Sequence, residues 1–170
     1  MRNIFKKAIL ENHEYILICD DDIALISNFI IKFNSFLKSN TKPRLLMLGS
    51  SQWNWENLET NNNFYSPNNT SNGSFANIYH RSTFDKVLEK ILEFNSPFDC
   101  GPMKSIFDKN CYVSNPNLVI AQLEKSSIIK TVNKNRNYDK FKWDIKKYKF
   151  AEEIHASKVI YKNIKKKQNK

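Results

Sequence analysis

Three consecutive carboxylates, Asp20, Asp21 and Asp22, directly follow the apolar run 15–19. A short apolar run between polar residues is typical of a buried strand in a parallel or mixed sheet. In open α/β sheets, ligands bind beyond the carboxyl ends of strands, where these side chains would lie. If the chain stays extended, Asp20 and Asp22 point to the same side, and their repulsion favours a bound divalent cation. The simpler interpretation is a strand followed by a solvated acidic turn.

The elements expected around this triplet alternate between helices and strands. Apolar residues at helical spacing predict helices, and continuous apolar runs predict strands. We expect helices within 3–12, 29–37 and 84–92, and strands at 15–19, 45–48, 75–79, 111–113 and 116–122. Ser27 or Asn28 would cap the second helix, and Ser82 the third. This order predicts an α/β fold, with a long loop at 52–74 of the kind that often binds ligands.

Length and composition restrict the class of protein. A chain of 170 residues is long enough for one domain with a core. Its three cysteines are widely spaced and form no CxxC pair, which indicates reduced thiols rather than a disulfide framework or a zinc site. There is no leader-like segment and no apolar run long enough to span a membrane. We therefore expect a soluble, cytoplasmic protein.

Much of the net charge of +10 lies in the last third of the chain. Tyr138, Phe141, Ile145 and Tyr148 could form one face of a basic helix. We expect a domain at 1–130 and a basic helical tail at 131–170. Such a tail can attract an anionic membrane surface, so peripheral membrane contact is one expectation for it.

Several motifs follow the acidic triplet in a defined order. An apolar strand ends at Gly49, and an aromatic strand at 75–79 precedes Arg81-Ser82 and a helix. The segments Pro97-Phe98-Asp99, 115–122 and 126–128 come next. This order resembles glycosyltransferase family 25, which includes bacterial lipopolysaccharide galactosyltransferases and the procollagen galactosyltransferase domain. The resemblance covers roughly residues 5–130, and the shared order of motifs carries it.

The resemblance implies a GT-A-like (Rossmann-like) mixed sheet flanked by helices. It also implies transfer of a hexose, commonly galactose, from a nucleotide sugar such as UDP-galactose to a hydroxyl of a glycan, lipooligosaccharide or protein. Asp20 and Asp22 would hold Mn²⁺ (or Mg²⁺) against the diphosphate, and Asp21 would belong to the same donor-binding motif. Asp99 would be the catalytic carboxylate that positions or deprotonates the acceptor hydroxyl. Its simpler interpretation is a turn-forming Asp. The residues expected to shape the site and contact the acceptor are Gly73, Tyr79 and Gln122.

The chain departs from the family pattern in two ways. Asp20 stands where the family usually has Glu. Family members also place a strand–helix–strand nucleotide-binding unit before the acidic motif, whereas only 14 residues precede Tyr15 here. The resemblance therefore implies a fold truncated at its N-terminus, and an inactive or partial transferase is an alternative.

Two other classes are compatible with parts of the pattern. Haloacid-dehalogenase-like phosphatases also place D-x-D after a buried strand, followed by a strand that ends in Ser or Thr, as at Ser50. However, Ala24 stands where that motif has Thr or Val. The Lys-rich end, with interleaved aromatic residues, could instead make the chain a basic module that binds nucleic acid or a membrane. No known nucleic-acid-binding motif is present, so nucleic acid is not the expected partner.

Overall fold

The computed structural model describes residues 1–38, 42–56, 58, 60–61, 63–93, 95–121 and 138–150. The helices there are α1 (Arg2–Leu10), α2 (Phe29–Leu37) and α3 (Phe84–Glu93), with short 3₁₀ turns between some of the strands. The three helices agree with the helical spacing of apolar residues. α3 is the most clearly amphipathic, with Phe84 and Val87 buried and Asp85 exposed.

A five-stranded sheet forms the centre of the fold, in the order β1-β7-β3-β8-β5. Its strands are β1 (Tyr15–Cys19), β7 (Ala76–His80), β3 (Leu45–Met47), β8 (Cys111–Ser114) and β5 (Phe64–Tyr65). β7 is antiparallel to both β1 and β3, and β3 is parallel to β8. β1, β3 and β8 therefore run in the same direction, and their carboxyl ends meet at one end of the sheet. The expectation of a mixed sheet with helices is confirmed.

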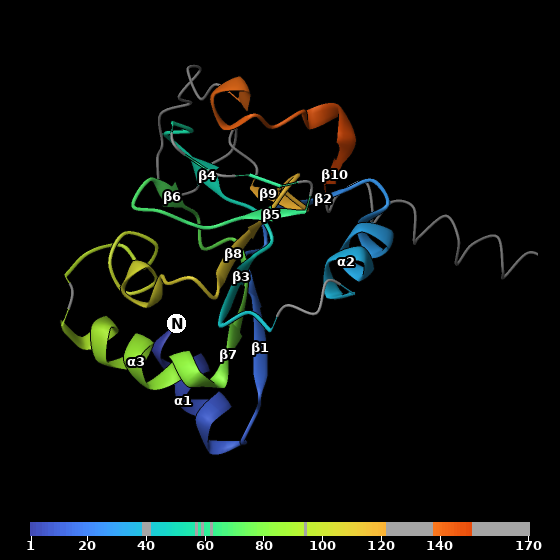
Figure 1. Ribbon diagram of the computed structural model, residues 1–170. Coiled ribbons are helices and arrows are strands. Elements are labelled where there is room, and N and C mark those ends of the chain that lie inside the picture. Colours follow the sequence, from blue (N-terminus) through green and yellow to red (C-terminus); the bar gives the residue numbers. More distant parts are fainter. Residues whose placement is uncertain are drawn as a thin grey trace, which may run out of the picture.

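Two small sheets lie beyond those carboxyl ends (Figure 1). One has the order β10-β2-β9 and consists of β10 (Tyr148–Phe150), β2 (Ile23–Ile26) and β9 (Val119–Ala121). The other pairs β4 (Ser51–Gln52) with β6 (Ser71–Asn72), and both strands except Ser51 lie within the segment 52–74 that was expected to be a loop. β2 follows the acidic triplet directly and was not expected.

The two faces of the central sheet bury separate apolar clusters. On one face, α1 and α3 lie side by side, and Phe5 packs edge-to-face against Tyr79 and Phe84 at centroid distances of 5.2 and 5.6 Å. On the other face, Leu46 and Leu48 pack with residues of α2 and the small three-stranded sheet. Because both faces are covered, β3 is fully buried, as its continuous apolar run predicts.

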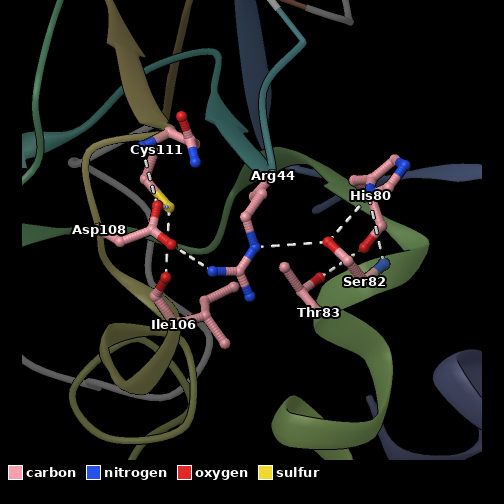
Figure 2. A network of polar contacts seen from close by, with 8 residues as sticks. Arg44, His80, Ser82, Thr83, Ile106, Asp108 and Cys111 are labelled. Atoms are coloured by element: carbon pink, nitrogen blue, oxygen red, sulfur yellow. Dashed lines mark hydrogen bonds and ion pairs between the residues drawn. The ribbon is translucent and has the colours of Figure 1, made fainter.

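A polar network closes the end of the sheet opposite the acidic triplet (Figure 2). Arg44, just before β3, forms an ion pair with Asp108 and donates from Nε to Oγ of Ser82 at 3.3 Å. The Cys111 thiol donates to Oδ1 of Asp108 at 3.4 Å. The Ser82 N–H donates to Nδ1 of His80 at 3.2 Å, so His80, not Ser82, caps the turn that leads into α3. The network thus joins the ends of three strands.

One further expectation is wrong. Residues 138–150 form two 3₁₀ turns and then β10 instead of one basic helix. Phe141 and Trp143 are both buried in the core and are two residues apart, which no single helix face allows. These residues therefore pack with the core of the domain expected at 1–130. The rest of the expected tail lies outside the described residues.

The first strand differs from its expected environment. β1 is an edge strand in this sheet, and only Ile18 of its side chains is buried. At the start of α2, Asn28 lies at the N-cap position with φ of 65° and makes no side-chain capping bond. Ile30 and Leu37 of α2 are exposed.

Candidate functional site

The antiparallel pairing of β1 with β7 places the acidic triplet beside the turn that precedes β7. The Asp20 N–H donates to the carbonyl of Phe75 at 2.9 Å. On the other side of β7, the Leu48 N–H donates to the carbonyl of Ala76, also at 2.9 Å. The segment 73–76 is thus held between the ends of β1 and β3. The backbone of Asp20 is fixed by the sheet, while its side chain is exposed.

The three carboxylates of the triplet repel one another. Burial raises the pKa of the Asp20 carboxyl, and the charges of Asp22, Asp21 and Asp99 raise it further, in that order. The chain bends at Asp21 and Asp22, so the alternation expected of an extended strand does not set their directions. The charge of Asp22 nevertheless raises the pKa of Asp20 more than the charge of Asp21 does.

Asp99 joins this group from a distant part of the chain. It lies in a turn in which the N–H groups of Cys100 and Gly101 bond to the carbonyl of Pro97. Its Oδ2 accepts the Gly73 N–H at 3.0 Å, across 26 residues of sequence. The thiol of Cys100 donates to its Oδ1 at 3.6 Å. Because its charge also acts on Asp20, Asp99 lies within the same site and does more than form its own turn.

Gly73 shapes the site through its backbone. Its φ is 111°, a conformation that residues with a side chain rarely adopt. A Cβ at this position would lie 2.3 Å from the Phe75 ring. Its N–H is held by Asp99, and its carbonyl accepts from Nδ2 of Asn77 at 3.3 Å. Both polar backbone groups of Gly73 are thus used inside the protein, so its part is to give the turn its shape.

Asn77 is a member of this group that the sequence analysis did not select. Its side chain is fully buried on β7, and Nδ2 also donates to the Tyr79 hydroxyl at 3.3 Å. Its Oδ1 is buried and has no hydrogen-bond partner among the described residues, and the same holds for Oδ1 of Asn72, next to Gly73. Buried amide oxygens without donors are rare and favour a bound water or cation. The signal available in the sequence was Asn77 itself, a polar residue among the apolar and aromatic residues of this strand.

The role expected for Tyr79 needs correction. Tyr79 is 0% exposed and packs against Phe5 and Phe98, so its side chain cannot contact an acceptor from solvent. Burial raises the pKa of its hydroxyl, and the charges of Asp20 and Asp99 raise it further. Its hydroxyl is thus influenced by both carboxylates, and it accepts the hydrogen bond from Nδ2 of Asn77. Gln122, the third expected acceptor residue, lies outside the described residues.

Lysine side chains cover ring faces of the two tryptophans at the start of the long loop. Trp53 is 48% exposed, but Nζ of Lys140 lies 4.6 Å from its ring centroid. Nζ of Lys142 lies 4.2 Å from the centroid of Trp55, whose indole N–H donates to the Lys140 carbonyl at 3.3 Å. These cation–π contacts cover ring faces that could otherwise stack on a sugar or a base.

The chemistry of the acidic group fits a hard divalent cation. Within the described ranges, Asp20, Asp21, Asp22 and Asp99 form no ion pair with Lys, Arg or His. In the same ranges, no three side chains of His, Cys, Asp or Glu converge to hold a metal by themselves. Mg²⁺ typically binds through one or two carboxylates and completes its shell with water and substrate phosphates. Asp20 and Asp22 could hold an ion in that manner.

A pocket of about 550 Å³ lies elsewhere, along residues 58–68. It includes Phe64 and Tyr65 of β5, which is the sheet edge opposite β1. Four strand spacings separate these edges, a distance of about 19 Å. None of the expected site residues that the structure describes lines this pocket, so it does not form part of the acidic group.

Comparison with known proteins gives no further assignment. No protein-family model matches the chain, and neither does any curated protein. None of the helices in the described ranges is long and apolar enough to cross a membrane. The function must therefore be inferred from the acidic group itself.

Proposed function

We propose that the chain is a metal-dependent glycosyltransferase, with a GT-A-like fold and a UDP-hexose, commonly UDP-galactose, as its donor. Asp20 and Asp22 would bind Mn²⁺ (or Mg²⁺) together with the donor diphosphate, and Asp21 would complete the donor-binding motif. The acceptor would be a hydroxyl of a glycan, lipooligosaccharide or protein. The resemblance to glycosyltransferase family 25 supplies the reaction class.

One observation carries the proposal. Four carboxylates from two distant segments gather at the carboxyl end of β1, and no cationic side chain in the described ranges pairs with them. A charge group of this kind raises the pKa of Asp20 and disfavours its ionised form unless a cation binds. The position is also the end of the sheet at which α/β folds bind their ligands.

Different residues of this chain would have different roles in the reaction. The cation would neutralise charge on the departing diphosphate. Asp99, held by the Gly73 N–H at 3.0 Å, would orient the acceptor hydroxyl and take its proton. The acceptor oxygen would bond to the anomeric carbon of the sugar as the bond from that carbon to the phosphate oxygen breaks. The nucleoside diphosphate would leave with that bonding electron pair. Asn77 and Tyr79 would support the Gly73 turn from inside the core.

Calorimetric titration of UDP with and without Mn²⁺ tests this assignment. Wild-type protein should bind UDP only when the metal is present, and Asp20→Ala/Asp22→Ala should abolish that binding. Asp85→Ala/Glu89→Ala is the matched control, because it also removes two exposed carboxylates, here from α3. Glu89 contacts Lys90 at 3.3 Å, and an exposed pair of this kind contributes little to stability.

Two results would contradict the proposal. Folded wild-type protein that binds no UDP in the presence of Mn²⁺ would indicate an inactive or partial transferase. UDP binding that persists in Asp20→Ala/Asp22→Ala would place the nucleotide away from the acidic group. If binding is found, hydrolysis of UDP-hexoses by wild type and Asp99→Asn separates the donor site from the proposed base. The Asp99 variant should bind UDP normally and lose turnover.

A further inference from the structure

The outward face of α2 combines exposed aliphatic side chains with lysines. Ile30, Ile31 and Leu37 are 65%, 70% and 53% exposed, while the opposite face of the helix packs Phe29, Phe33 and Phe36 onto the core. A helix that is apolar on nearly all sides usually has a partner on each of them. In the part of the chain that the structure describes, the outward side has none.

The segment of sequence that contains α2 carries charge of only one sign. No Asp or Glu occurs from Ile23 to Trp55, a stretch that contains Lys32 and Lys38 within or next to the helix. Neither lysine forms an ion pair with a described residue. The surface is therefore complementary to an anionic partner.

A second basic segment lies beside the start of α2. The Ser27 N–H donates to the Lys147 carbonyl at 2.7 Å, and β10 continues from there along β2 (Figure 1). Lys146 and Lys149 of this segment are exposed, and Ile145, just before them, is 41% exposed. Of the three lysines in this segment, only Lys147 has a carboxylate partner among the described residues, and that partner is Asp144 at 3.1 Å. The combination of aliphatic and basic residues thus extends beyond the helix.

We infer that this face binds the surface of an anionic lipid bilayer. Ile30 and Ile31 would enter the boundary between headgroups and acyl chains, and the lysines would contact lipid phosphates. Exposed aliphatic side chains flanked by cations, with no acidic residue in the helix itself, are what an interfacial helix requires. An interface between protein chains would instead favour aromatic anchors and paired charges. This inference goes beyond the proposed transferase activity, and it adds α2 to the basic C-terminal residues for which membrane contact was expected.

Sedimentation of the full chain with vesicles tests the inference. Vesicles of phosphatidylcholine mixed with phosphatidylglycerol should bind wild-type protein, whereas vesicles of phosphatidylcholine alone should bind it much less. Ile30→Asn/Ile31→Asn should weaken partitioning to the anionic vesicles about tenfold, because the aliphatic contribution is lost. Leu92→Asn is the matched control, since Leu92 on α3 is also 65% exposed, and it should bind as wild type does.

A second variant tests the charge contribution independently. Lys38→Gln/Lys149→Gln should weaken binding to anionic vesicles several-fold and reduce its salt dependence, with Lys86→Gln on α3 as the control. Equal binding by wild type and Ile30→Asn/Ile31→Asn would overturn the inference and assign membrane contact to other basic segments. Light scattering that shows a wild-type dimer, converted by this variant to a monomer, would also overturn it. The face would then be an interface between copies of the chain.

Discussion

Replacing Asp20 with Asn should raise the thermal stability of the metal-free protein at neutral pH. Burial and the charges of Asp22, Asp21 and Asp99 raise the pKa of Asp20 in the folded state. At low pH, Asp20 is protonated in the folded and unfolded states, and the repulsion is absent. As the pH rises from the ordinary Asp pKa of about 3.9 through the raised folded value, the folded state loses stability relative to the unfolded state.

The size of the effect is limited by solvent. The Asp20 side chain is exposed, so each like-charge neighbour destabilises by about 0.2–0.5 kcal/mol. Three neighbours together give about 1 kcal/mol, which corresponds to a rise in melting temperature of about 2–4 °C in a protein of this size. A cation at ten times its Kd should stabilise wild type by about 1.4 kcal/mol, and the gain should be absent in Asp20→Asn/Asp22→Asn.

Thermal unfolding followed by circular dichroism between pH 4 and pH 8 measures this difference. Asp85→Asn supplies a control of opposite sign, because Asp85 lies in the first turn of α3, where a negative charge is favourable by about 0.3–1 kcal/mol. The stability of Asp20→Asn relative to wild type should therefore increase as the pH rises, while Asp85→Asn should be less stable than wild type at pH 7. A metal-free Asp20→Asn protein that is less stable than wild type at pH 7 would refute the reasoning, since the carboxylate would then make a stabilising bond.

Three further expectations concern the fold that holds the site. Gly73→Ala should lower the free energy of unfolding by about 2–3 kcal/mol in a denaturant titration, because its Cβ would meet the Phe75 ring at 2.3 Å; an unchanged midpoint would contradict the turn geometry. Asp108→Asn should cost about 1 kcal/mol at pH 7 and progressively less as the pH falls through the folded pKa of Asp108, since desolvation raises that pKa but hydrogen bonds and the charge of Arg44 lower it by more; an equal loss at pH 7 and in acid would argue against the ion pair. Trp143→Ala should cost about 3–5 kcal/mol in the same titration, and a loss below 1 kcal/mol would mean that residues 138–150 do not belong to the core.

The elements with a strong local pattern could be predicted from the sequence. The strand β3 lies in a continuous apolar run, β7 and β8 are largely apolar and aromatic, and α3 has a regular apolar period. β2 was missed because its run of only four apolar residues follows the acidic triplet directly, with no Gly or Pro between the two strands. Residues 138–150 were misread because Phe141, Ile145 and Tyr148 also fit helical spacing, and the competing strand pairing with β2 is visible only in three dimensions.

In the candidate site too, some residues could be selected from the local sequence, whereas others are brought together only by the fold. Asp20 and Asp22 could be selected because they directly follow an apolar run. Asp99 could be selected only through the order of motifs, and its bond to Gly73 depends on a fold that brings distant segments together. The burial of Tyr79 was not foreseen, because its aromatic strand gave no indication of which face would be covered by α1 and α3. Only the structure identifies Asn77 as a candidate, because its buried Oδ1 has no hydrogen-bond partner among the described residues.

The pairing of β2 has a consequence for the order in which the chain folds. Ile23–Ile26 bonds on one side to residues 119–121 and on the other to residues 148–150. β1 likewise pairs with residues 76–80 and with no nearer segment of the described chain. The strand before the acidic triplet can therefore pair only after residues 76–80 have been synthesised, and the strand after it can complete its pairing only after most of the chain has been synthesised. Pairings between such distant segments are slow to form. We expect the acidic site to be completed late in folding, after α3 and the strands around it have formed a stable nucleus.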